Sequence, residues 1–306
     1  MQGSSRSYIL AAVAAIVLFA SGGAFGQAPA KAPVKPQFKF STPIAPGVAV
    51  PDKIESSIGT LNLTYGYPKA DTVEKIYDNL DRSRALQAYL MAIPIVNQAG
   101  MRDSLSKFGP ANQTDVIWED LVDPRTVELT ANDNTIYNFI WLDTKKGPLV
   151  VEIPPEVLGG VNDFWYRWVA DVGITGEDRG KGGKYLVLPP GYKGEIPAGY
   201  VVLHPSTFGN WLFFRAFLVD GSTKPGVESV KKHLKIYQLS EAANPPSLKF
   251  INASGVPSTF VAPGDYGFWE LLNKVIQEEP SEGSDPTTLG LFASIGIVKG
   301  QAFSPD

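Results

Sequence analysis

The sequence predicts an α+β protein that is mainly β, with an antiparallel β-sandwich or jelly-roll-like core and flanking helices. Three observations predict this fold. Short runs of aromatic and β-branched residues fill residues 116–220, turn residues separate these runs, and helical periodicity occurs only on either side of them. The chain contains no cysteine, so this core has to be stable without disulfide bonds.

The first 26 residues have the features of a secretory signal peptide. Arg6 precedes an apolar run of 13 residues that ends at Ala20, and small residues at Ala24 and Gly26 fit a cleavage site after Gly26. As a helix the run would span about 20 Å, which is too short to cross a bilayer. An uncleaved N-terminal anchor is the alternative. We therefore expect a periplasmic or secreted protein with no membrane span after cleavage of residues 1–26.

Residues 27–54 are expected to form a proline-rich linker, since six prolines occur between Gln27 and Pro51. Without the signal peptide, 26 basic and 31 acidic residues remain, which gives a net charge of −5 that is spread along the chain. Such a balance argues against nucleic acid and against anionic membrane surfaces as partners.

Apolar side chains recur at helical spacing across residues 71–108, from Val73 onwards. Pro94 is predicted to end the first helix, and residues 95–108 are predicted to form a second, shorter one. After the β-rich region, residues 227–306 are predicted to be helical or irregular. The helices predicted there cover residues 227–238 and 265–278.

The β-rich region is predicted to contain seven strands with turns between them. Glycine pairs and proline–glycine sequences mark the turns, among them Gly159-Gly160. The glycines of residues 180–183 are predicted to permit positive φ angles in a hairpin connection, with a backbone anion site as the alternative. The predicted strands cover residues 127–129, 135–142, 149–153, 164–169, 185–188, 200–203 and 211–218.

Five residues of this region are predicted to bind a ligand. Alternation along residues 135–142 places Tyr137, Phe139 and Trp141 on one face, and the polar groups of Tyr137 and Trp141 suit the rim of a site. In the FWYRWV segment an arginine lies between two tryptophans, which suits cation–π stacking. The predicted ligand-binding residues are Tyr137, Trp141, Tyr166, Arg167 and Arg215.

Asp143, Asp171 and His204 are the candidate catalytic residues. Hydrolysis of a glycosidic bond needs two carboxyl groups about 5 to 9.5 Å apart, and Asp143 and Asp171 supply carboxyl groups in the β-rich region. Aspartates in turns, however, usually have only a structural role. The chain has two histidines, His204 and His233, and lacks the HExxH and GxSxG motifs. A metal site of carboxylates with His204 is a further option, and the sequence indicates no particular metal or cofactor.

Several motifs occur in an order that resembles the DUF1254 domain of bacterial exported proteins: VEKIYDNLDRSRALQAYL, NTIYNFIWLDTKKGPLVVEIPP, FWYRWVADVGITGEDRGKGGKYLVLPPGYKG, LFFRAFLVDG and LGLFASIGIVKGQAFSPD. The resemblance covers residues 55–306 and implies a β-rich fold with flanking helices and no assigned activity. It also implies a second, jelly-roll DUF1214 domain after the last motif in many relatives. The chain stops at Asp306, so this domain is expected to be absent, and the chain is either a fragment or a single-domain form. In a fragment, residues 292–303 are expected to form an exposed surface meant to face the missing domain.

Two functions fit these observations, and the sequence does not decide whether the protein is an enzyme. In the first, the exported protein binds or hydrolyses a small polar or carbohydrate-like ligand on an aromatic-lined face of the sandwich. In the second, it is a non-catalytic structural or assembly module that packs against a DUF1214-like domain or forms a homo-oligomer. Convergence of the predicted site residues around one cleft would favour the first function.

Overall fold

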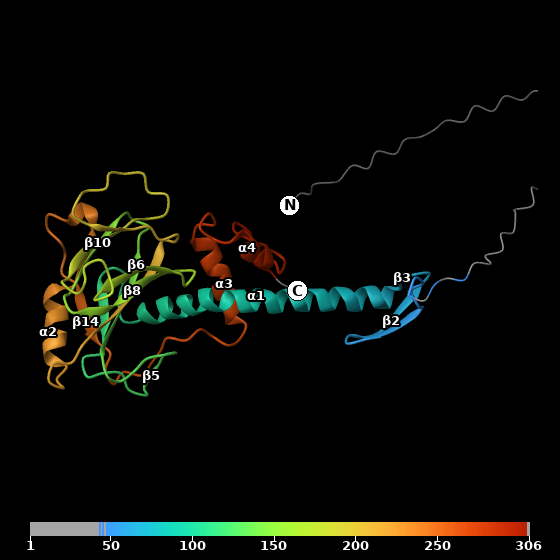
Figure 1. Ribbon diagram of the computed structural model, residues 1–306, viewed down its shortest axis with the longest axis horizontal. Coiled ribbons are helices and arrows are strands. Elements are labelled where there is room, and N and C mark those ends of the chain that lie inside the picture. Colours follow the sequence, from blue (N-terminus) through green and yellow to red (C-terminus); the bar gives the residue numbers. More distant parts are fainter. Residues whose placement is uncertain (1–42, 44, 46, 305–306) are drawn as a thin grey trace, which may run out of the picture. The chain divides into compact units, whose positions relative to one another are not determined.

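The computed structural model describes residues 43, 45 and 47–304 (Figure 1). The chain divides into two units, Met1–Val50 and Pro51–Asp306, and the helices and strands of the described residues belong to the second. The predicted signal peptide, residues 1–26, lies outside the described residues, as does most of the predicted linker.

The described residues form a mainly β fold with four α-helices and several multi-stranded sheets, as the composition of the middle region predicts. A three-stranded sheet precedes the long helix α1, and the remaining helices follow the β-rich region (Figure 1). The elements are β1 Lys53–Ser56, β2 Gly59–Thr64, β3 Tyr67–Pro68, α1 Ala70–Leu105, β4 Thr114–Ile117, β5 Thr126–Val127, β6 Ile136–Asp143, β7 Leu149–Ile153, β8 Val157–Asp163, β9 Trp168–Gly173, β10 Gly183–Val187, β11 Val201–Leu203, β12 Gly209–Ala216, α2 Lys224–His233, β13 Lys235–Gln238, β14 Lys249–Asn252, β15 Ser258–Thr259, α3 Gly267–Glu278 and α4 Pro286–Ala293.

Two larger sheets contain most of the strands. One has six strands in the order β14-β4-β6-β12-β8-β9, and the other has four in the order β11-β10-β7-β13. Most neighbouring strands are antiparallel, but β10 with β11, β14 with β4 and β15 with β5 are parallel. Each parallel pair is joined through at least 13 intervening residues, a length that permits a crossover connection. The expectation of a purely antiparallel core is therefore wrong at these pairs.

Strand β6 has two buried faces. As the alternation predicts, Tyr137, Phe139 and Trp141 belong to one core cluster, and Ile136 and Ile140 belong to another. The first cluster also contains apolar residues of α1, α3 and α4, whereas the second contains residues of β7, β10, β13 and α2. The aromatic face is therefore packed against helices and is not an open surface.

Gly159 and Gly160 lie inside strand β8, and the prediction of a turn at this pair is wrong. Strand β8 lies between β12 and β9, which approach it closely on both sides. A Cβ atom at Gly159 would overlap the carbonyl oxygen of Phe213, and one at Gly160 would overlap the Trp168 ring. The glycines are thus required by close packing within the sheet.

The predicted strand at residues 164–169 is also wrong, because a turn with Tyr166 at φ +61° separates β8 from β9. The glycine-rich segment after β9 is not a hairpin, since it links the six-stranded sheet to β10 in the four-stranded sheet. Gly180 and Gly182 do adopt positive φ angles of 71° and 78°, as predicted. Asp178 fixes this connection by accepting hydrogen bonds from the Tyr185 hydroxyl and a backbone amide.

Helix α1 continues through Pro94 to Leu105, so the prediction that proline ends it is wrong. Proline removes one backbone hydrogen bond and costs about 3 kcal/mol inside a helix. The residues after it compensate, because Ile95, Val96 and Ala99 are buried in the first core cluster. Although α1 has 36 residues, no helix among the described residues is both long and apolar enough to span a membrane.

Helix α2 ends at His233, and after Leu234 the residues Lys235–Gln238 form strand β13 where a continued helix was predicted. Leu234 has extended backbone angles, and β13 then pairs with β7. This pairing buries Ile236 and Tyr237 on opposite sides of the strand, in different core clusters. Tertiary packing therefore overrides the helical pattern here, whereas α3 forms close to its predicted position.

Candidate functional site

Tyr137 and Arg215, two of the predicted ligand-binding residues, are paired in the register of β6 and β12. The Arg215 guanidinium carbon lies 5.8 Å from the centre of the Tyr137 ring. The Tyr137 hydroxyl accepts hydrogen bonds from the backbone and side-chain nitrogens of Asn132 at 3.3 and 3.1 Å. Because Tyr137 is only 7% exposed, the pair forms part of the core packing and offers a ligand little surface.

Tyr166 and Arg167 belong to the turn between β8 and β9. Asp163 organises this turn, since its Oδ1 atom accepts the backbone N–H groups of Trp165 and Arg167, both at 2.9 Å. The Tyr166 ring is partly exposed, with its centre 6.3 Å from that of Trp211.

The Arg167 side chain ties this turn to two distant segments. Its guanidinium donates hydrogen bonds to Asp163 Oδ2 at 3.0 Å, to the Ser206 hydroxyl, and to the carbonyl oxygen of Gly283 at 2.7 Å. The expected stacking between tryptophans is not formed, because these hydrogen bonds direct the guanidinium elsewhere. Arg167 therefore acts as a structural clamp in this arrangement.

Asp171 and His204 lie apart from the other predicted residues. Asp171 is on the edge strand β9 and accepts a hydrogen bond from the Thr175 hydroxyl, and His204 is exposed after β11 in the four-stranded sheet. Asp171 is three strands from Asp143 and four residues further along the sheet. Strand spacing then gives a separation of roughly 20 Å, too large for the two carboxyl groups to act on one glycosidic bond.

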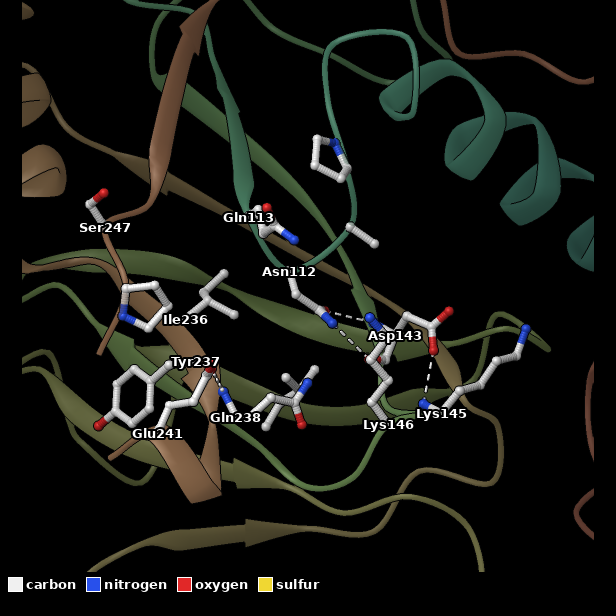
Figure 2. A pocket seen from close by; sticks show the side chains of 14 residues that line it. Asn112, Gln113, Asp143, Lys145, Lys146, Ile236, Tyr237, Gln238, Glu241 and Ser247 are labelled. Atoms are coloured by element: carbon white, nitrogen blue, oxygen red, sulfur yellow. Dashed lines mark hydrogen bonds between the residues drawn. The ribbon is translucent and has the colours of Figure 1, made fainter. Parts of the chain in front are cut away.

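Trp141 and Asp143, in contrast, lie close together at the end of β6. Two cavities adjoin Asp143, and the larger of them does not include Trp141. The side-chain amide of Asn112 donates a hydrogen bond to the carbonyl oxygen of Asp143 and accepts one from its backbone N–H, both at 2.8 Å (Figure 2). Asp143 Oδ1 in turn accepts a hydrogen bond from the backbone N–H of Lys145 at 2.8 Å. The larger cavity encloses about 670 Å³. Polar side chains from several elements reach it: Asn112, Gln113, Asp143, Lys145, Lys146, Gln238, Glu241 and Ser247.

A second cavity, of about 290 Å³, shares Pro110, Ala111 and Asp143 with the first. The end of α1 contributes Arg102, and strand β4 contributes Thr114. Its apolar wall consists of Leu105, Val116 and Trp141.

Glu279, just after α3, is a buried carboxyl group close to the end of β6, because it binds Gly209, the residue paired with Asp143. Its two oxygens accept the backbone N–H groups of Phe208 and Gly209 at 2.6 and 3.1 Å. Burial raises the pKa of the Glu279 carboxyl to about 7, although these hydrogen bonds and nearby Lys145 act in the opposite direction. Ionisable groups from separate parts of the chain thus lie near Asp143 at the end of β6.

The structure therefore brings only Trp141 and Asp143, of the predicted residues, to a common cavity. Arg102, Thr114 and Glu279 were not predicted, because they come from segments far apart in the sequence and belong to no recognisable motif. Within the described part of the chain, no group of three or more histidine, aspartate or glutamate side chains is arranged to hold a metal ion.

Comparisons with known proteins agree with the fold. A search of curated proteins gave no match. Among solved structures, the chain is similar to the crystal structure of the VPA0106 protein from Vibrio parahaemolyticus, with a TM-score of 0.54 and 19% sequence identity over 74% of this chain and 54% of that one. The chain thus spans about half the length of that protein, and at this identity the likeness concerns the fold alone. Residues 113–238 match the family described as "Protein of unknown function (DUF1254)". The matched segment contains β4 to β13, so the similarity to the DUF1254 family covers the central β-rich region.

Proposed function

We propose that the protein is an assembly module that binds another folded domain or subunit through the exposed side of α1. The observation that carries this proposal is a long apolar surface on the helix. Large exposed apolar side chains gathered on one element commonly mark a site of protein–protein interaction. Its members, each between 36% and 61% exposed, are Val73, Ile76, Tyr77, Leu80, Leu86, Tyr89, Leu90, Met91 and Ile93.

The direction of these side chains indicates the shape of the partner. At 100° per residue, residues 73, 76, 77 and 80 project within one sector of about 100°. Residues 86, 90 and 93 project within a second sector, rotated by about 120° from the first. A single straight helix could not contact both sectors, so a folded domain that wraps around α1 fits better.

The two larger sheets supply the scaffold that holds this helix. We propose that they pack face to face as a sandwich, because one core cluster contains inward-facing residues from both, including Leu212 of β12 and Val151 of β7. The opposite face of the six-stranded sheet packs on the buried part of α1. Helix α3 covers part of α1, since the Tyr89 ring centre lies 4.7 Å from that of Phe268, yet Tyr89 remains 41% exposed.

Light scattering of the mature chain tests the self-association form of this proposal. We expect a mass above that of the monomer, and we expect the Leu80→Glu/Leu90→Glu variant to restore the monomer, because a charge in an apolar interface is strongly unfavourable. Ile174→Glu is the matched control, since Ile174 is 52% exposed, within the range of 38% to 56% spanned by Leu80 and Leu90, but lies outside α1. A mass that neither variant changes would contradict a role for the α1 surface.

We also propose export to the periplasm or the medium, supported by the apolar run from Tyr8 to Ala20. N-terminal sequencing of the protein from the exported fraction is expected to begin at Gln27. Recovery of the chain with Met1 intact from the membrane fraction would support the anchored alternative.

Binding of a small polar or carbohydrate-like ligand is a second candidate function, favoured by the two cavities beside Asp143. The roughly 20 Å between Asp143 and Asp171 favours binding over hydrolysis by that pair.

A further inference from the structure

The smaller cavity beside Asp143 contains buried polar atoms whose hydrogen-bonding capacity is unused. Arg102 Nη2 and Thr114 Oγ1 both belong to residues that line it, and neither atom has a hydrogen-bond partner among the described residues. Thr114 is 5% exposed, and the Arg102 side chain is 14% exposed. A buried polar group without a hydrogen-bond partner destabilises the folded state. Two such atoms at one cavity favour a site that another molecule completes.

Arg102 is held in a fixed orientation by its other contacts. Its Nε atom donates to Asp103 at 2.9 Å, and its Nη1 atom donates to Glu278 at 2.6 Å. The guanidinium carbon also lies 5.1 Å from the centre of the Phe164 ring. With two nitrogens engaged, Nη2 remains as a positioned donor, and binding a ligand would require little reordering of the side chain.

The charges around the cavity define the class of ligand. Arg102 and Lys274 contribute two positive charges to the lining, and Asp103 and Asp143 contribute two negative ones. Glu278 adds a further negative charge against Arg102. An anionic ligand would gain no net attraction from this balance and would lie close to the Asp143 carboxylate, so an uncharged ligand is favoured.

We propose that this cavity binds a small, uncharged polyhydroxy compound of about monosaccharide size. A hydroxyl group can accept a hydrogen bond from Arg102 Nη2 or Thr114 Oγ1, and another can donate to Asp143. The apolar wall of Leu105, Val116 and Trp141 would contact the carbon skeleton of such a compound. The cavity volume of about 290 Å³ restricts the ligand to the small end of the range that protein pockets bind. This inference deepens the second candidate function and does not depend on the α1 surface.

Isothermal titration calorimetry of the mature chain with glucose, galactose, ribose, xylitol and myo-inositol tests the proposal. We expect saturable binding of at least one of these compounds and no saturable binding of acetate or lactate. Calorimetry is needed because polyols at high concentration stabilise most proteins without occupying a site.

Thr114→Val separates a binding role from a structural one. Valine keeps the shape of the side chain and removes a hydroxyl that has no partner within the described chain, so the unliganded variant is expected to be at least as stable as the wild type. Its affinity for the bound compound is expected to fall about tenfold, which corresponds to about 1.4 kcal/mol. Asp143→Asn is expected to weaken binding as well.

Ser258→Ala is the matched control, because Ser258 also has a buried hydroxyl without a partner in the described residues but lines a different cavity. Its affinity is expected to equal that of the wild type. Saturable binding of the carboxylates alone, equal affinity in Thr114→Val and wild type, or no saturable binding of any polyhydroxy compound would each overturn the proposal. The oligomeric state of the same samples reports separately on the α1 surface.

Discussion

Replacing Trp118 by alanine is expected to lower the free energy of unfolding by about 3–5 kcal/mol. Trp118 is fully buried and packs edge-on against Phe139 and Phe260, with ring centres 5.0 and 5.6 Å apart. Its indole N–H donates a hydrogen bond to Thr126 Oγ1 at 3.0 Å. The substitution leaves a cavity and removes this donor, and the loss is a large share of the 5–15 kcal/mol typical of a folded domain.

Urea denaturation followed by circular dichroism measures this loss. Trp168→Ala is the matched control, because Trp168 is 54% exposed on the edge strand β9, and the same substitution there is expected to cost about 1 kcal/mol. Equal losses in the two variants would mean that the cluster around Trp118 is not the main core of the unit.

Replacing Asp115 by asparagine is expected to make the stability of the protein less dependent on pH. Asp115 lies on β4, is fully buried, and neither of its carboxyl oxygens has a hydrogen-bond partner in the described part of the chain. Burial raises the pKa of Asp115 well above its usual value, with nearby Lys231 acting in the opposite direction. The folded state therefore keeps a proton that the unfolded state releases.

The sign of the effect follows from this difference. Below about pH 4 both states of the wild type are protonated at Asp115, and stability from this group is at its maximum. As the pH rises, the wild type is expected to lose about 1.4 kcal/mol per pH unit relative to D115N until the pKa of the folded state is reached. Glu279, whose pKa is also raised, adds a loss of the same sign that remains in the variant.

Denaturant titrations at several pH values measure the difference between wild type and D115N. Asp120→Asn, at an exposed position of the same segment, is the control and is expected to follow the wild-type profile. Parallel profiles for wild type and D115N would show that Asp115 is not held protonated by the fold.

Local patterns in the sequence were enough to predict the mainly β character and the strands at β6, β7 and β12. The two-residue alternation in β6 correctly separates Tyr137 and Trp141 from Ile136 and Ile140. It could not indicate that helices cover the aromatic face, because alternation reports which residues share a side and not what lies opposite. The sequence therefore could not indicate that Tyr137 and Trp141 are only 7% and 5% exposed.

The errors have a common origin in tertiary contacts. Gly159-Gly160 has the composition of a turn, yet the approach of Phe213 and Trp168 requires glycine within a strand. Pro94 would end an isolated helix, yet burial of the following turn sustains α1. At the candidate site, Asp143 was predicted from its strand, whereas Arg102 and Thr114 acquire significance only when distant segments meet.

The pairing of β14 with β4 and of β15 with β5 affects the order in which the chain can assemble. The residues that face each other in these pairs are 135 positions apart at Thr114 and Lys249, and 132 apart at Thr126 and Ser258. At a synthesis rate of about 5–20 residues per second, the edges of β4 and β5 would wait roughly 7 to 27 s for their partners. During that interval these strand edges are open to pairing with other nascent chains. A chaperone that covered them would prevent such pairing until β14 and β15 are synthesised.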